Sequence, residues 1–186
     1  MQYYNYIVTL LIVTFFSCNF QKEKPTELSI SSVSIIHGQI NHIDTSFYQI
    51  TKFETNNNKT DTTFITREIF HIEANGFLEL DDITNNKFAK NYTEEKIIDE
   101  TQQTLSIIHS AKNENLEIQK QIMIVDISNP SNAKVTSIFI DKIIATNSTS
   151  VQQRLFWQLD SYFQIATITT TKEFLETTKL VRITWR

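Results

Sequence analysis

Glycine and proline are scarce in this sequence, whose 186 residues include two of each. Gly38 and Gly76 stand alone, so the chain has neither a Rossmann fingerprint nor a Walker loop, both of which need closely spaced glycines. Turns must instead use Asn, Asp and Ser, which tolerate left-handed backbone conformations and form Asx turns. The scarcity of glycine therefore excludes the common nucleotide-binding motifs.

A basic segment is also missing, and the formal net charge is -4 at pH 7. Proteins that bind nucleic acid usually carry a clustered basic surface, so we expect no nucleic-acid partner. The same charge argues against a polybasic patch that would bind a membrane. With 40% hydrophobic and 20% charged residues, the chain has the composition of a folded protein, and its length suits one domain.

Cysteine occurs once in the chain, at Cys18. It follows the apolar stretch 6–16, YIVTLLIVTFF, which is too short for a transmembrane helix of roughly 20 residues. Residues 15–18, FFSC, resemble the lipobox of bacterial lipoproteins, in which apolar residues and a small residue precede an obligatory cysteine. The alternatives are an uncleaved N-terminal anchor and a secretory signal with an incidental cysteine.

The resemblance implies that residues 1–17 are a signal peptide that is cut off, and that the thiol of Cys18 receives a diacylglycerol. Each buried methylene of an acyl chain contributes about 0.8 kcal/mol, so two or more chains give durable anchoring. Residues 18–27 would then be a tether, followed by a single globular domain at 28–186. We therefore expect a lipid-anchored protein of a bacterial cell envelope, at the outer membrane, although Asn19 after the cysteine does not decide between the two membranes.

The C-terminal half of the chain contains β-branched and aromatic runs separated by short polar turns, a pattern that predicts an antiparallel β-meander of about six strands. We expect an α+β fold in which helical or irregular elements from residues 40–80 pack on this sheet, with an all-β sandwich as the alternative. The runs cover residues 88–99, 103–110, 116–127, 133–145, 151–159, 162–171 and 179–186.

The N-terminal part of the domain has weaker patterns. Residues 28–36 alternate like a strand, and residues 44–54 suit either a helix or a strand. Residues 65–76 contain isoleucines at helical spacing and predict a helix with Gly76 at its C-terminal end.

Several of the expected strands are apolar on both faces. Within residues 133–145, for example, Ile138 and Ile140 point to one side of the strand and Phe139 points to the other. Helices from the first half of the chain could cover one face of the sheet. The other face would then need a second sheet, a protein partner or a lipid-like ligand.

No catalytic motif is recognisable in the sequence. The four histidines lack the i, i+4 pairing of metalloproteases, and the G-x-S-x-G elbow of serine hydrolases is absent. We therefore predict no enzymatic activity, no metal-binding residues and no cofactor. The candidate binding patch is instead the aromatic group around residues 159–161, which consists of Phe156, Trp157, Tyr162 and Phe163.

Three functions fit these features. The first is an interaction or structural module that Cys18 holds at the envelope beside a protein partner. The second is a carrier of a lipid-like apolar ligand, and the third is an envelope enzyme. A cavity lined by Ile138, Ile140 and Phe156 would favour the carrier, whereas a filled core with an exposed aromatic patch would favour the interaction module.

Overall fold

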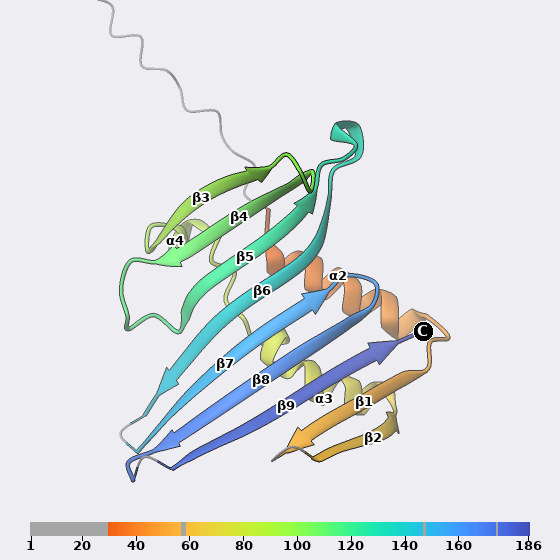
Figure 1. Cartoon of the computed structure of the whole chain (residues 1–186), viewed down its shortest axis with the longest axis vertical. Helices are drawn as coiled ribbons and strands as arrows, with labels where there is room; N and C mark the ends of the chain where they lie inside the picture. Colours follow the sequence, from red (N-terminus) through yellow and green to blue (C-terminus); the bar gives the residue numbers. More distant parts are fainter. Residues whose placement is uncertain (1–29, 57–58, 147, 174) are drawn as a thin grey trace, which may run out of the picture.

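The computed structural model of the chain describes residues 30–56, 59–146, 148–173 and 175–186. Nine antiparallel strands form one sheet in the order β2-β1-β9-β8-β7-β6-β5-β4-β3 (Figure 1). The strands are β1 (Ile50–Asn56), β2 (Lys59–Ile65), β3 (Tyr92–Asp99), β4 (Thr104–Ala111), β5 (Ile118–Asp126), β6 (Lys134–Ala145), β7 (Thr149–Gln158), β8 (Tyr162–Thr171) and β9 (Glu176–Trp185). The N-terminal hairpin β1–β2 joins the sheet by pairing with the last strand, β9.

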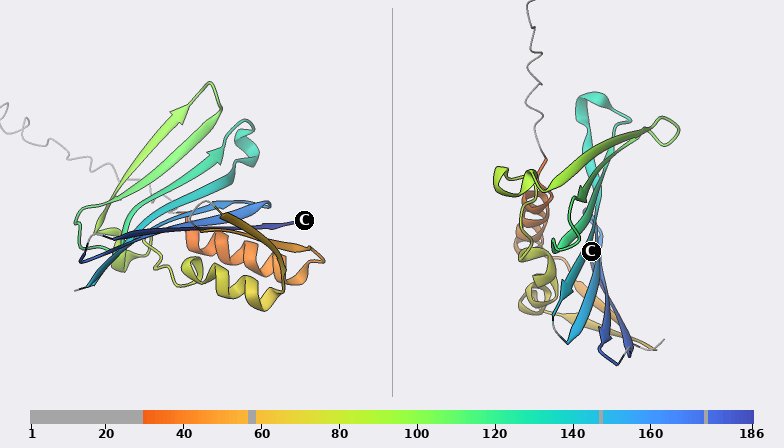
Figure 2. Two further views of the ribbon diagram at one scale, coloured as in Figure 1. Left: turned by 60° about the horizontal axis from the view of Figure 1, so that its bottom comes forward. Right: turned by 90° about the vertical axis from the view of Figure 1, so that its left-hand side faces the viewer.

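Two helices, α2 (Ser32–Thr45) and α3 (Arg67–Leu78), lie on the same side of the sheet (Figure 2). The short helix α4 (Asn86–Ala89) precedes β3, and the 3-10 turn η2 (Pro130–Asn132) connects β5 to β6. We call the side on which α2 and α3 pack the helix-covered face. The opposite side, where no helix of the described residues packs, is the helix-free face.

Both long helices begin at a hydroxyl N-cap and bury one narrow stripe. The side chain of Ser31 accepts a hydrogen bond from the backbone N–H of Ser34 at 3.1 Å, and Thr66 accepts one from Ile69 at 3.4 Å. Each stripe has the i, i+4, i+7 spacing of a helix that packs against a core. The buried residues of the stripes are Ile36, Ile40 and Ile43 in α2 and Phe70, Ala74 and Phe77 in α3.

The core between the helices and the sheet contains a cluster of aromatic rings among aliphatic side chains. Phe77 of α3 lies edge-on to Trp157 of β7 at 5.1 Å between ring centroids, and 5.4 Å from Phe163 of β8. Trp157 and Phe163 stack on each other at 5.1 Å, and Phe70 and Trp185 complete the cluster. Edge-to-face and offset aromatic pairs of this kind add to the free energy gained by burying their area.

The predicted α+β class with a six-strand meander is wrong. The chain is mostly β, with a single sheet of nine strands and three α-helices among the described residues, and it fits the all-β alternative better. The difference arises from β1 and β2, whose polar, Thr-rich sequences lack the apolar alternation of a typical strand. These two strands extend the sheet beyond β9 instead of packing on it.

The N-terminal predictions also need correction. The alternation at residues 28–36 suits a strand, but helix α2 begins at Ser32. The helix expected at residues 65–76 exists as α3, but it continues through Gly76 to Leu78 and Glu79 is its C-cap. Its isoleucines do not form the buried stripe, since Ile72 is 67% exposed while Phe70 and Phe77 face the core.

Candidate binding surface

The register of the sheet brings one side chain from each strand into a single row across the helix-free face. Directly paired residues lie about 5 Å apart in neighbouring strands, so members of such a row are in contact or near contact. From β3 to β2 the row is Glu95, Ile108, Ile122, Phe139, Phe156, Gln164, Arg182, Phe53 and Thr62.

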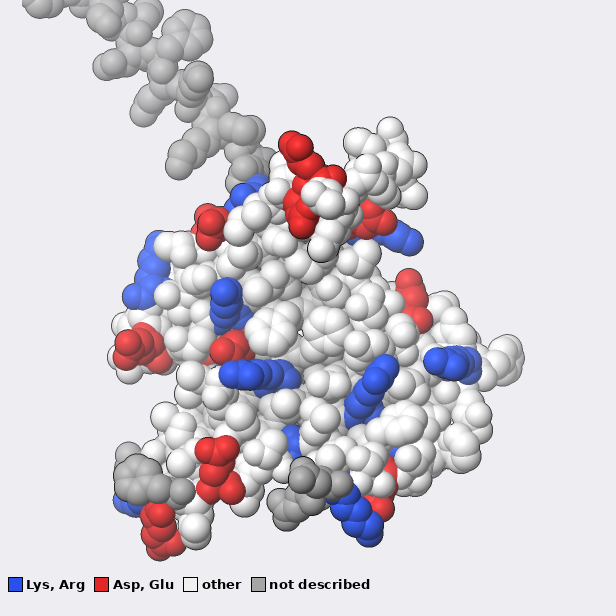
Figure 3. All heavy atoms as spheres, viewed as in Figure 1, with Lys and Arg blue, Asp and Glu red and all other residues white. Residues whose placement is uncertain are grey.

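Four consecutive members of this row are apolar, and we call Ile108, Ile122, Phe139 and Phe156 the apolar row. Each of the four is half-buried by its neighbours within the sheet, and no described helix covers it. In the middle of this face several Lys and Arg side chains lie among uncharged ones, and acidic side chains lie mainly around its rim (Figure 3). Contiguous apolar surface on an open face is typical of an interaction site.

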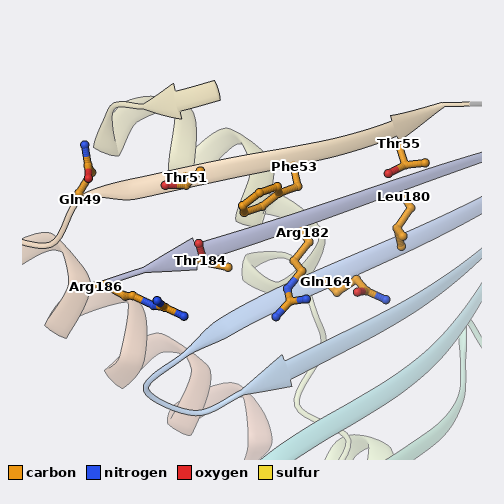
Figure 4. A pocket seen from close by; sticks show the side chains of 9 residues that line it. All are labelled: Gln49, Thr51, Phe53, Thr55, Gln164, Leu180, Arg182, Thr184 and Arg186. Atoms are coloured by element: carbon orange, nitrogen blue, oxygen red, sulfur yellow. The ribbon is translucent and has the colours of Figure 1, made fainter. Parts of the chain in front are cut away.

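A groove of about 560 Å³ lies beside the apolar row on the same face, between β8, β9 and β1 (Figure 4). Its apolar members are Phe53 and Leu180, and its cationic members are Arg182 and Arg186. Hydroxyl and amide side chains complete its lining, which consists of Gln49, Thr51, Phe53, Thr55, Gln164, Leu180, Arg182, Thr184 and Arg186. The groove therefore combines apolar contact area, hydrogen-bonding groups and positive charge, and among the residues that the structure describes no Asp or Glu lines it.

Arg182 is held at the boundary between the groove and the apolar row. Its guanidinium carbon lies 4.0 Å from the ring centroid of Tyr162, a cation–π contact that orients the planar group. Tyr162 in turn packs against Phe156 of the apolar row, with ring centroids 5.7 Å apart. One aromatic side chain thus connects the charged groove to the apolar row.

Charged side chains on the helix-covered face have partners. The ammonium of Lys52 lies 2.6 Å from Glu54 Oε2 and 2.6 Å from Glu73 Oε1 of α3, and Lys179 approaches Glu54 Oε1 at 3.1 Å. Hydrogen bonds from Lys52, then from Asn56 and Lys179, lower the pKa of Glu54 to about 2. These charges therefore neutralise one another within the fold.

The two arginines of the groove differ from this arrangement. Among the residues that the structure describes, no carboxylate lies within ion-pair distance of the Arg182 or Arg186 side chain. Both arginines are exposed, so their guanidinium groups are open to an external anion. In a chain with a net charge of -4, this groove therefore brings together two guanidinium groups that have no Asp or Glu partner among the described residues.

The structure divides the predicted aromatic patch between the two faces. Trp157 and Phe163 are 0% exposed and belong to the core beneath α3. Phe156 and Tyr162 lie in contact on the helix-free face. The division follows from strand alternation, because each pair of neighbours in the sequence must point to opposite sides.

The predicted carrier cavity is not formed by the residues named for it. Ile138 and Ile140 are both 0% exposed in the core of the helix-covered face, whereas Phe156 is on the other side of the sheet. The core under the helices consists of packed aliphatic and aromatic side chains. The groove with Arg182 is instead open on the helix-free face.

Two further polar side chains, His109 and Lys142, are buried. His109 is 6% exposed, and its Nε2 lies 2.9 Å from Glu94 Oε2. Its neighbour across the strands, Gln121, accepts a hydrogen bond of 2.6 Å from Ser32. Elsewhere on the sheet, Lys142 Nζ lies 2.5 Å from Glu117 Oε1. Within the described ranges, no cluster of three His, Cys, Asp or Glu residues has an arrangement that could hold a metal ion.

The groove residues were not singled out from the sequence. Alternation along 179–186 places Arg182 on the other face of the strand from Val181 and Ile183. This is the one feature of the local sequence that points to the groove. Phe53 reaches the groove only because β1 pairs with β9, a contact between the two ends of the domain. Sequence patterns within one segment carry no information about that pairing.

The lipidation residue Cys18 and the whole of 1–29 lie outside the described residues, so the signal peptide stays a prediction. In the part of the chain that the structure describes, none of the helices has the length and apolar character needed to cross a bilayer. No protein-family model, curated protein sequence or solved structure matches this chain.

Proposed function

We propose that this protein is a lipid-anchored module of a bacterial cell envelope, that it acts by binding and not by catalysis, and that its helix-free face is the binding surface. The observation that carries the proposal is the contrast between the two sides of one sheet. The helix-covered face buries its aromatic side chains under α2 and α3, while the apolar row and the arginine groove have no such cover among the described residues.

The contents of the two faces support binding at the helix-free face. Half-buried Phe139 and Phe156 contribute apolar contact area, and Arg182 and Tyr162 are residue types that are enriched at energetically important interface positions. A solvent-exposed surface without a binding partner would not need a contiguous apolar row across four strands. The anchor at Cys18 would keep this surface close to envelope components.

Photo-cross-linking in the source bacterium tests the surface. A photoreactive phenylalanine analogue at Phe139 or Phe156 should give discrete cross-linked products, because those positions would touch the partner. The same analogue at Ile72, which is 67% exposed on α3, is the matched control and should give none. Equal cross-linking from both faces, or none from the helix-free face, would refute the proposed surface.

The anchor has a separate test. Cys18→Ser should abolish metabolic labelling by a fatty-acid probe and leave an unprocessed precursor that retains residues 1–17. The wild-type chain labelled in parallel is the control. Normal processing of the Cys18→Ser chain would exclude the lipoprotein proposal and leave the binding surface to be judged by cross-linking.

A further inference from the structure

We propose that the groove between β8, β9 and β1 binds a small amphiphile, a molecule with one carboxylate or phosphate attached to an apolar body. The anion would be held by the guanidinium groups of Arg182 and Arg186, and the apolar body would lie against Phe53 and Leu180. This inference rests on the proposed function, because it names the ligand class of the same face.

The charge of the groove selects an anion. Arg182 and Arg186 both line it, and no Asp or Glu of the described residues contributes to the lining. A guanidinium presents several donors in a rigid plane that matches the two oxygens of a carboxylate or phosphate. A fully apolar ligand would instead cover these two cations without giving them a hydrogen-bond acceptor, which is unfavourable.

The orientation of the Arg182 side chain favours its binding an anion. Its guanidinium lies over the Tyr162 ring at 4.0 Å, so part of its conformational freedom is already lost before a ligand arrives. Thr51 and Thr184, a directly paired residue couple on β1 and β9, add hydroxyl groups to the same groove. An anion at this position would therefore meet charged and neutral hydrogen-bond donors together.

The apolar half of the groove determines the apolar part of the ligand. Phe53 pairs directly with Arg182 across β1 and β9, and Leu180 is two residues before Arg182 on the same strand face. The volume of about 560 Å³ falls in the usual range for small-molecule sites. On the other side of Arg182, Gln164 and then Phe156 continue the row, so a longer apolar body could extend toward Phe139.

Equilibrium dialysis of the full chain, purified in a non-ionic detergent, tests the proposal with four radiolabelled probes: octanoate, octyl phosphate, inorganic phosphate and octanol. Octanoate or octyl phosphate should bind measurably more tightly than octanol or inorganic phosphate, since only an amphiphile uses both halves of the groove. The double variant Arg182→Gln/Arg186→Gln should weaken binding of that amphiphile by at least about tenfold. Phe53→Ala should weaken it while keeping both charges.

Arg154→Gln is the matched control, because Arg154 is an exposed arginine on the helix-free face at β7, outside the groove. This variant should leave the affinity for octanoate and octyl phosphate unchanged. Partitioning of the probes into detergent micelles is the same for all variants, so it does not affect the comparison. Equal binding of octanol and octanoate, an undiminished affinity in the double variant, or no binding of either amphiphile would overturn the ligand class. Binding of inorganic phosphate as tight as that of octyl phosphate would overturn the apolar half.

These outcomes are separate from those of the proposed function. If neither amphiphile binds but Phe139 still cross-links in cells and Ile72 does not, the surface is correct and its ligand class is wrong. If Phe139 fails to cross-link while octanoate binds through Arg182, the groove is a ligand site and the wider interaction surface is refuted.

Discussion

The two faces of the single sheet differ in how deeply their apolar side chains are buried and in whether their charged side chains have partners. On the helix-covered face, aromatic and aliphatic residues are fully buried and Lys52 and Lys179 have carboxylate partners. On the helix-free face, the apolar row is half-buried, and Arg182 and Arg186 have no carboxylate partner among the described residues. Since both faces belong to the same strands, we propose that stability is concentrated on one side and binding on the other.

The largest expected difference comes from truncating the same residue type on each face. Phe163→Ala should destabilise the fold by about 3–5 kcal/mol, because Phe163 is 0% exposed and the change leaves a cavity among aromatic rings. Phe156→Ala removes a half-buried ring from the other face and should cost about 1 kcal/mol. Urea unfolding of the two variants measures both values, and similar costs would contradict the division between the faces.

Charged residues should show the same contrast at a smaller scale. Lys52→Gln leaves Glu54 and Glu73 without their shared cation in a partly buried position, and should reduce the free energy of unfolding by about 2 kcal/mol. Arg182→Gln removes a cation that has no carboxylate partner within the described residues, and should change the free energy of unfolding by less than about 0.5 kcal/mol. A larger loss in Arg182→Gln than in Lys52→Gln would show that the groove arginine serves the fold.

Acid should reduce the stability of the fold through Glu54, which lies on the helix-covered face. Its pKa is lowered from 4.5 to about 2 in the folded protein, so its ion pairs stabilise the fold at pH values above 4.5. That contribution, about 1 kcal/mol after solvent screening, should be lost as the pH falls from 4.5 toward 2. In Glu54→Gln this part of the pH dependence should disappear from urea unfolding curves, and an unchanged pH profile would count against the ion-pair network.

The smallest expected effect is a gain in stability. Gly76 is inside α3, and a Cβ added there would lie 3.5 Å from Ile165 Cδ1 and 3.7 Å from Leu155 Cδ2, which are ordinary contacts. Gly76→Ala should therefore raise the free energy of unfolding by about 0.5–1 kcal/mol through helix propensity. Gly38→Ala in α2, where nothing lies within 4 Å of an added Cβ, is the control for propensity alone. A loss at Gly76 with a gain at Gly38 would show that the helix packs more tightly on the sheet.

The strands from β3 to β9 could be located from the sequence because their β-branched and aromatic runs are bounded by polar turns. Helix α2 was missed because serines and apolar residues alternate at its start, although Ile36, Ile40 and Ile43 have helical spacing. The hairpin β1–β2 has no clear sequence pattern, since the charged residues Lys52 and Glu54 lie on its helix-covered face.

The candidate site depended even more on distant pairing. Alternation alone showed that Arg182 points away from Val181 and Ile183. That Arg182 meets Phe53, and that Phe156 and Tyr162 connect it to an apolar row, required the order and register of β1, β9, β8 and β7. Such order is set by the packing of the whole sheet and not by the composition of any one strand.

Oxidative footprinting tests the central claim that the helix-free face is covered by a partner in the cell envelope. Side-chain oxidation of Phe139, Phe156 and Tyr162 would be compared between intact envelopes and the purified chain, with the fully exposed Phe47 as an internal reference. We predict that these three residues are protected in envelopes by several-fold relative to Phe47. Equal oxidation in both preparations would contradict the claim that a partner covers this face.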